Sequence, residues 1–202
     1  TNVVGAITSA VATLTVLVPP TFISQPVSQT NVIGTTASFA GGAAGTAPIG
    51  YRWQFNGTNL TNSGRFSGVT TTNLTITNAQ PSDAGNYTLV ASNIAAVGTS
   101  AVAVLTVWLP PSIITQPTNQ TLVMGSNAVF VVNAGGSAPL IYQWRLGGTN
   151  LAGASASVLN LANVQPADAG NYSVVITNGA GAITSAVAVL TVRVPPILTL
   201  QP

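Results

Sequence analysis

The sequence predicts an all-β fold in which antiparallel sandwiches follow one another along the chain. Short runs of alternating apolar and polar residues recur about every ten residues, and Gly, Asn, Pro and Asp separate them. No stretch shows the sustained period of a helix. Long segments also return at regular intervals, which indicates that one folding unit is repeated. The chain is therefore expected to contain tandem sandwiches, with incomplete pieces of the same unit at both ends.

The repeat is clearest in a segment that occurs three times. TSAVATLTVLVPP at 8–20 returns as TSAVAVLTVWLPP at 99–111 and as TSAVAVLTVRVPP at 184–196. Because each copy ends at a Pro-Pro pair, the copies mark the ends of successive units. They predict two complete units, at 20–110 and 111–195.

The two ends of the chain match fragments of the same unit. Residues 1–19 resemble the closing hairpin of a preceding unit, and residues 196–202 resemble the opening strand of a following one. A lone two-stranded ribbon is marginal in water. We therefore expect both fragments to be completed by further chain or by a neighbouring copy.

Each expected strand lies between turn residues. The opening strand of both units ends at a Gln-Pro pair, as suits an edge strand, because proline cannot donate a hydrogen bond to a neighbour. A Gly- and Ala-rich turn follows the second strand, and a Trp stands in the middle of the third. The last strand alternates as far as the Pro-Pro pair. The expected strands are Thr21–Ser24, Thr36–Ala43, Gly50–Phe55, Asn73–Thr77, Gly85–Ser92 and Thr99–Val107 in the first unit, and Ser112–Thr115, Asn127–Ala134, Ile141–Leu146, Ser157–Leu161, Gly170–Thr177 and Thr184–Val192 in the second.

Two motifs connect the repeat to a known family. Trp53 and Trp144 each stand in a strand and are followed about 30 residues later by Asp-Ala-Gly-Asn-Tyr, which ends at Tyr87 and Tyr172. These motifs resemble the immunoglobulin fold. The tandem arrangement is most similar to the I-set-like domains of large bacterial surface and secreted repeat proteins. The resemblance extends over nearly the whole chain and implies immunoglobulin-like sandwiches.

The resemblance also assigns structural roles. In this family the Trp packs on a disulfide between the sheets, and the Tyr hydroxyl bonds back to the main chain. This chain has no cysteine. Its likeness to the family puts Gly41 and Leu89 at the cysteine positions of the first unit, and Val132 and Val174 at those of the second. We therefore expect sandwiches without disulfides, and a looser core around Gly41.

A further likeness distinguishes the first unit. Arg65-Phe66-Ser67-Gly68 resembles the strand opening of variable-type domains, in which the arginine pairs with the aspartate of the tyrosine turn. This implies a pair between Arg65 and Asp83. The second unit has no arginine at that place, so Asp168 is expected to cap backbone N–H groups of its own turn.

The scarcity of charge argues against an enzyme, a metal site and a cofactor. Of 202 residues only four are basic and two are acidic, and His and Cys are absent. Hydrolysis of a glycosidic bond needs two neighbouring carboxylates, whereas Asp83 and Asp168 belong to different units. A nucleophilic Ser or Thr needs a base, and zinc and calcium need clustered ligands. We expect no catalytic residue, no cofactor and no metal.

Two classes of partner are also unexpected. Four scattered arginines do not make the clustered basic surface that nucleic acid requires. Pro-Pro pairs interrupt the apolar stretches, which fall short of the roughly 20 residues that a membrane span needs. We therefore expect no nucleic-acid partner and no membrane span in this segment.

Period-2 alternation predicts an unusual outer face on the larger sheet. Its outward positions hold valines and no acidic residue, a composition that favours association. Either another part of the chain covers this face or it is an assembly surface, although valine is also simply a good strand former. The predicted face comprises Arg52, Val90, Val102 and Val104 in the first unit, and Arg145, Val175, Val187 and Val189 in the second.

Trp108, next to the Pro-Pro pair between the units, is the best candidate for a glycan contact. An exposed indole ring can serve as a platform for sugars. Its counterparts in the other copies are Leu17 and Arg193, so a contact between neighbouring domains is the alternative.

These features favour a structural or interaction protein. We expect a segment of an extracellular or cell-surface fibre, stalk or filament that acts in spacing, adhesion or self-assembly, with neighbouring repeats or further copies as partners. Because proline restricts φ, the Pro-Pro junctions are expected to make a semi-rigid rod. The alternative is a set of accessory glycan-binding modules of a large secreted enzyme or adhesin.

Overall fold

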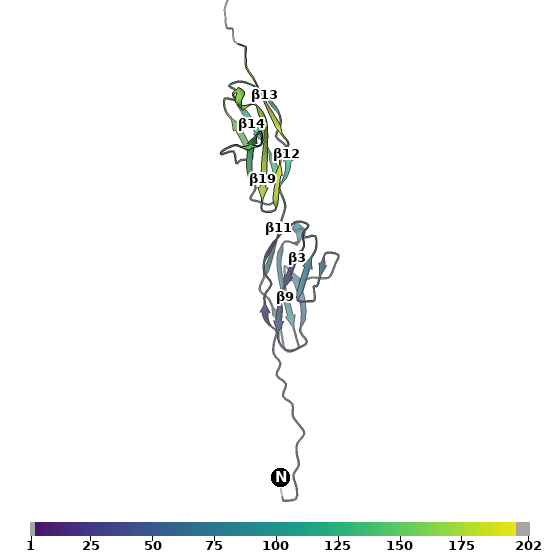
Figure 1. Cartoon of the computed structure of the whole chain (residues 1–202). Helices are drawn as coiled ribbons and strands as arrows, with labels where there is room; N and C mark the ends of the chain where they lie inside the picture. The colour runs from purple at the N-terminus through teal and green to yellow at the C-terminus, as the bar shows by residue number, and fades with distance from the viewer. Residues whose placement is uncertain (1–2, 197–202) are drawn as a thin grey trace, which may run out of the picture. The chain divides into compact units, whose positions relative to one another are not determined.

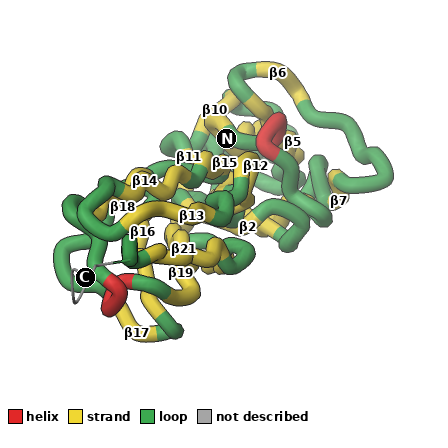
Figure 2. Tube along the Cα trace, turned by 90° about the horizontal axis from the view of Figure 1, so that it is seen from above, coloured by secondary structure: helices red, strands yellow, loops and turns green. Residues whose placement is uncertain are grey.

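The computed structural model describes residues 3–196, which form two compact units (Figure 1). None of the described sheets contains strands of both units. Helical structure in the described residues is limited to two short 3-10 turns, η1 (Pro81–Asp83) and η2 (Pro166–Asp168), which are red in Figure 2. The predicted all-β fold with tandem sandwiches is thus confirmed.

The first unit is a sandwich of short strands. Its larger sheet has the order β2-β11-β9-β5-β6, and β10 also pairs with β9. On the other side, β3, β8 and β7 form one sheet and β1 pairs with β4. The strands are β1 (Thr21–Ser24), β2 (Gln29–Val32), β3 (Ala37–Ala40), β4 (Gly42–Ala44), β5 (Gly50–Phe55), β6 (Thr58–Asn59), β7 (Phe66–Ser67), β8 (Asn73–Ile76), β9 (Gly85–Ser92), β10 (Val97–Thr99) and β11 (Ala103–Trp108).

Aromatic residues form the core of the first unit. The rings of Phe39 and Tyr87 stack with their centroids 4.8 Å apart, and Trp53 lies 6.1 Å from Phe39. All three side chains are buried. The indole N–H of Trp53 donates to the carbonyl of Thr71 at 3.0 Å, so the buried ring has a partner for its polar atom.

The second unit repeats this plan. Its larger sheet has the order β13-β21-β19-β16-β17, with β20 on β19, and β13 runs parallel to β21. Phe130, Tyr172 and Trp144 make the same aromatic core, at 4.8 and 6.0 Å between centroids. The strands are β12 (Ser112–Thr115), β13 (Gln120–Val123), β14 (Ala128–Val131), β15 (Asn133–Gly135), β16 (Ile141–Leu146), β17 (Thr149–Asn150), β18 (Val158–Leu161), β19 (Gly170–Asn178), β20 (Gly181–Thr184) and β21 (Ala188–Arg193).

Aliphatic packing occupies the cysteine positions of the family. A Cβ on Gly41 would lie 3.1 Å from the Cδ2 atom of Leu89. The fully buried Leu89 side chain therefore fills the space that Gly41 leaves, and the looser first core that we expected is not seen there. In the second unit Val132 and Val174 are both buried.

The closing strand of each unit is shorter than expected. Instead of one strand at Thr99–Val107, the first unit has β10 and β11 with a break after Thr99. Ser100 causes this break, because its hydroxyl accepts the backbone N–H of Leu89 at 2.9 Å and takes the place of a ladder bond. Ser185 accepts the N–H of Val174 in the same way. A side-chain bond has here replaced regular pairing.

The fragment before the first unit contains little regular structure. Residues 6–20 carry neither helix nor strand, and nearly all of their side chains are exposed. The hairpin expected at 1–19 is therefore not formed by the described residues, and its completion by other chain stays a prediction. The strand expected at 196–202 lies outside the described residues, apart from Pro196.

Candidate interaction surface

The outward face of the larger sheet in the first unit has the predicted composition. Val104 projects from β11, and Val102 lies in the break between β10 and β11, with 55% of its surface exposed. Val90 on β9 is half-buried and pairs in register with Arg52 on β5. The guanidinium of Arg52 donates to the carbonyl of Leu60 at 3.4 Å. The valines are thus partly exposed to solvent, whereas Arg52 forms a hydrogen bond within its own unit.

The second unit presents an equivalent face. Val187 is exposed to the same extent as Val102, and Val189 is exposed on β21. Val175 on β19 is half-buried. The Nε atom of Arg145 donates to the side-chain carbonyl of Asn150 at 2.8 Å. The same surface chemistry therefore occurs at matching positions of both units.

The two aspartates lie in the turns before β9 and β19. Asp83 is buried and accepts the backbone N–H of Gln80 at 2.7 Å. Asp168 accepts the N–H of Gln165 at 2.8 Å, the capping role that we expected of it. Both carboxylates thus hold the start of a 3-10 turn, so capping is not special to the second unit.

The tyrosine turn of the second unit has the hydrogen bond that links the Tyr172 hydroxyl to the main chain. The hydroxyl of Tyr172 donates to the backbone carbonyl of Asp168 at 2.7 Å, the bond that the resemblance implied. Burial is the main cause that raises the pKa of Tyr172 above its ordinary value of 10.0, and the charge of Asp168 raises it further. This hydroxyl therefore stays protonated and keeps its hydrogen bond.

Arg65 has contacts within the first unit. Its guanidinium donates to the carbonyl of Asn78 at 3.3 Å and lies 5.5 Å from the ring centroid of Phe66. It thereby joins β7 to the turn that follows β8. The pair with Asp83 stays a prediction.

Trp108 ends β11 and is half-buried. Its backbone carbonyl accepts the N–H of Ile33 at 2.9 Å. A partly covered ring offers less surface to a sugar than an exposed one, so the glycan contact stays a prediction without support from its position.

A hydrogen-bonded group that we call the linker clamp was not predicted. In the first unit it consists of Val18, Thr46 and Asn93. The Val18 N–H donates to the Thr46 hydroxyl at 2.7 Å, and the Thr46 N–H donates back to the Val18 carbonyl at 2.9 Å. The side-chain amide of Asn93 donates to the carbonyls of Val18 and Thr46, at 2.7 and 2.9 Å. The residue before Pro-Pro is thus fixed to the unit that follows it.

The second unit has the same linker clamp, made of Leu109, Ser137 and Asn178. Leu109 and Ser137 exchange bonds of 2.9 and 3.0 Å, and Asn178 donates to both of their carbonyls at 2.8 Å. Gly136 permits this approach, because a Cβ there would lie 2.9 Å from the Pro110 carbonyl oxygen. The repeat of a hydroxyl residue and an asparagine at equivalent positions was the signal for this feature.

The described residues contain no group of three or more His, Cys, Asp or Glu side chains that could hold a metal ion. No helix in the described part of the chain is long and apolar enough to cross a membrane. The polar residues of the predicted face are Arg52 and Arg145, whose guanidinium groups can form hydrogen bonds.

Comparison with known proteins agrees with this architecture. A model of the immunoglobulin domain matches residues 19–93 and 110–178. The chain is 32% identical to mouse (Mus musculus) Roundabout homolog 1 over its whole length, and 34% identical to mouse hemicentin-1 over 94% of its length. It spans only 14% and 3% of these relatives, respectively.

Solved structures lead to the same family. A three-domain structure of titin domains I67–I69, an E-to-A mutated variant, matches 93% of this chain and 70% of its own, with a TM-score of 0.79 and 26% identity. The named relatives are animal proteins, so the bacterial part of the resemblance finds no support among them. Roundabout homolog 1 and hemicentin-1 are cell-surface or extracellular proteins, as expected for this chain. The chain belongs to the immunoglobulin domain family.

Proposed function

We propose that this chain is a non-enzymatic interaction segment of an extracellular array of immunoglobulin domains. It binds through the outward faces of the larger sheets, and its partners are further copies or neighbouring repeats of the same protein. One observation carries the proposal. Exposed valines occupy equivalent outward positions in both units, at Val102 and Val104 and at Val187 and Val189.

Physical chemistry supports association through this face. Natural sheets usually place charges where strands meet solvent, because charge discourages contact between sheets. Of the eight residues of this face only Arg52 and Arg145 are charged, and both donate hydrogen bonds within their own units. A surface with little net charge lacks the repulsion that keeps molecules apart.

The relatives support the general class of an extracellular interaction segment built of immunoglobulin domains. Roundabout and hemicentin are extracellular immunoglobulin-domain proteins of adhesion and guidance. Self-association through the valines, assembly into filaments and a role in spacing go beyond this likeness and are our proposals. The absence of an enzymatic activity is proposed on the charge content, since a site for acid–base chemistry would need groups that this sequence lacks.

Lysine substitutions test the proposed face. Val102→Lys combined with Val187→Lys should weaken self-association at least tenfold, because each lysine would have to be desolvated in the contact. Sedimentation velocity over a range of concentrations measures the association, and electron micrographs show whether filaments form. The thermal unfolding midpoint should change little, since both positions are exposed.

A control variant separates this effect from charge alone. Val129→Lys with Val131→Lys adds the same charge on β14, in the other sheet of the second unit, where both valines are exposed. It should leave the association unchanged. Equal association in wild type and in the variant at residues 102 and 187 would refute a role for the valine face.

A further inference from the structure

The two units differ at one edge of the smaller sheets. In the first unit β7 pairs antiparallel with β8, and Phe66 lies opposite Ile76. In the second unit β18 pairs with β14 alone, in a two-stranded sheet. Within the described residues, one long side of β18 therefore has no partner strand.

A six-residue difference between the units removes the covering strand. The backbone N–H of Trp53 donates to the backbone carbonyl of Val69, and the backbone N–H of Trp144 donates to that of Ala154. Val69 and Ala154 therefore occupy equivalent positions in the two units. The first unit reaches this point from β6 through residues 61–68, which include β7, whereas the second unit has only residues 152–153 between the equivalent positions. The second unit is too short here to form its own covering strand.

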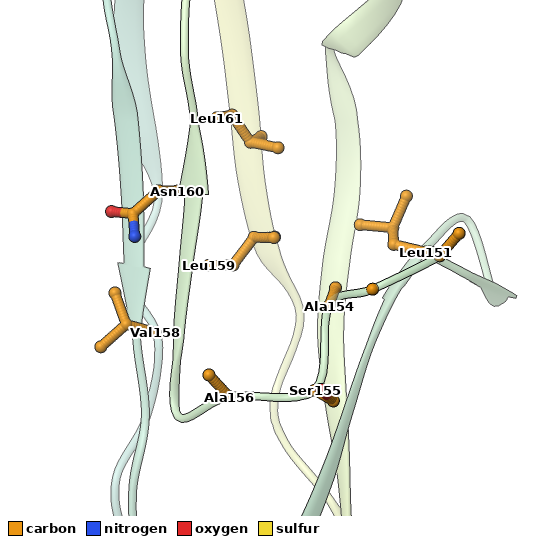
Figure 3. A pocket seen from close by; sticks show the side chains of 10 residues that line it. Leu151, Ala154, Ser155, Ala156, Val158, Leu159, Asn160 and Leu161 are labelled. Carbon is orange, nitrogen blue, oxygen red and sulfur yellow. The ribbon is translucent and has the colours of Figure 1, made fainter.

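An open pocket lies beside the uncovered strand (Figure 3). It has a volume of about 370 Å³. Figure 3 shows Leu159 and Leu161 of β18 pointing toward Leu151 and Ala154 across it, while Val158 points away. The pocket thus opens on the apolar interior between the two sheets. No charged residue in the described part of the chain lines it.

Burial confirms that this part of the core is less covered in the second unit. Ile76 is fully buried in the first unit, whereas the equivalent Leu161 is half-buried. Val69 is buried and the equivalent Ala154 is half-buried and smaller. Covering these side chains would therefore remove apolar surface from water, which favours binding.

The backbone of β18 can also form hydrogen bonds on this side. In the first unit the N–H of Thr77 points toward the covering strand and donates to the Arg65 carbonyl at 2.9 Å. The equivalent residue is Ala162, and Asn160 faces the same way because alternate residues of a strand share a direction. The strand reads Val-Leu-Asn-Leu, without the lysine or proline that usually protects an edge.

We propose that β18 accepts an extended peptide segment of a partner protein, which pairs antiparallel with it and places an aromatic side chain in the pocket. This is strand addition to a sheet edge, in which the main chain supplies affinity and the pocket supplies specificity. The first unit shows the chemistry of the occupant, because its own β7 offers Phe66 followed by the small residues Ser67 and Gly68. The site is separate from the valine face and does not depend on it.

A peptide with the sequence of residues 63–69, SGRFSGV, tests the proposal on the whole chain. In NMR titrations of labelled protein, the amides of Asn160 and Ala162 and of residues 151–156 should shift, with a Kd on the order of 0.1–1 mM for so short a peptide. The amides of β8 should not shift, because β7 already covers them. A peptide with serine in place of the phenylalanine should bind at least tenfold more weakly.

Two protein variants localise the site. Inserting the six residues SGRFSG between Gly153 and Ala154 restores a covering segment and should abolish peptide binding. Asn160→Pro removes one outward donor from the edge and should weaken binding at least tenfold. Far-UV circular dichroism confirms that each variant is folded, and the insertion remains decisive if Asn160→Pro does not fold.

Three results would overturn the proposal. The first is an absence of shifts in β18 at millimolar peptide. The second is binding that is equal for the phenylalanine and serine peptides, or that survives the insertion. The third is a stable dimer of this chain through β18 that the peptide does not dissociate, which would make a second copy the occupant.

Discussion

Asp83 and Asp168 serve the same local purpose, because each accepts the N–H that opens a 3-10 turn. The turn in the second unit then presents the Asp168 carbonyl to the Tyr172 hydroxyl. The Asp168 carboxylate and the Tyr172 hydroxyl thus fix the turn that leads into β19. At the residue scale, these polar groups hold turns.

Removing the hydroxyl of Tyr172 measures how much its hydrogen bond to the Asp168 carbonyl contributes to stability. Tyr172→Phe should lower the free energy of unfolding of the second unit by about 0.5–1.5 kcal/mol, because the bond to the Asp168 carbonyl is lost. Urea unfolding followed by circular dichroism checks it. Tyr142→Phe is the matched control, since Tyr142 is half-buried in the same unit and its hydroxyl makes no such bond in the described part of the chain. Equal effects of the two changes would contradict the assignment.

At the scale of elements, the strands with strict alternation were predictable from sequence. β5, β9, β16 and β19 lie where the pattern placed them, within one residue. β2 was missed, because Gln29–Val32 is mostly polar and owes its strand to pairing with β11. β13 was missed in the same position of the second unit. β2 and β13 form because they pair with β11 and β21, and a local sequence pattern does not reveal such tertiary pairing.

The candidate sites also divide into those that a local pattern predicts and those that depend on the folded structure. The outward valines followed from alternation alone, since a strand sends successive side chains to opposite faces. The linker clamp depends on residues far apart in the sequence, and the open edge of β18 depends on a length difference. Ser137 follows β15 and Asn178 ends β19, for example, and only the folded unit brings these two residues together. The residue types of the clamp repeat at equivalent positions in the sequence, but spacing alone does not show that they are in contact.

The linker clamp makes a measurable prediction. Asn178→Ala removes the donor to the carbonyls of Leu109 and Ser137 and should accelerate hydrogen exchange at the Ser137 amide at least tenfold. The free energy of unfolding of the second unit should fall by about 1 kcal/mol.

A second change separates the lost donor from lost packing. Asn178→Asp keeps the shape of the side chain and the oxygen that accepts the Ala180 N–H at 2.9 Å, but has no amide to donate. It should accelerate exchange as strongly as Asn178→Ala. Unchanged exchange in Asn178→Asp would show that the amide bonds do not hold the linker.

At the scale of the whole molecule, few groups can titrate. The sequence has no His, Cys or Lys, and only two carboxylates. Between about pH 5 and 9 no side chain of this composition changes its charge at ordinary pKa values. Stability in this range therefore depends on apolar burial and on hydrogen bonds between groups whose charge does not change.

The expected pH profile follows from this composition. The free energy of unfolding should stay constant within about 0.5 kcal/mol from pH 5 to 9. Above pH 10 it should fall, because the pKa of Tyr172 is raised in the folded state and the unfolded chain loses that proton first. Urea unfolding at a series of pH values measures this. Tyr172→Phe should reduce the alkaline loss, and a transition near neutral pH would contradict the account.

The linker clamp also bears on how such a protein can change its length during evolution. Each clamp joins the residue just before a Pro-Pro pair to the unit that follows it, because Thr46 and Asn93 bind Val18, and Ser137 and Asn178 bind Leu109. A gene duplication that copies one unit with its preceding residue also copies the attachment. Such an array can gain or lose whole units by recombination, without a new junction having to arise by mutation.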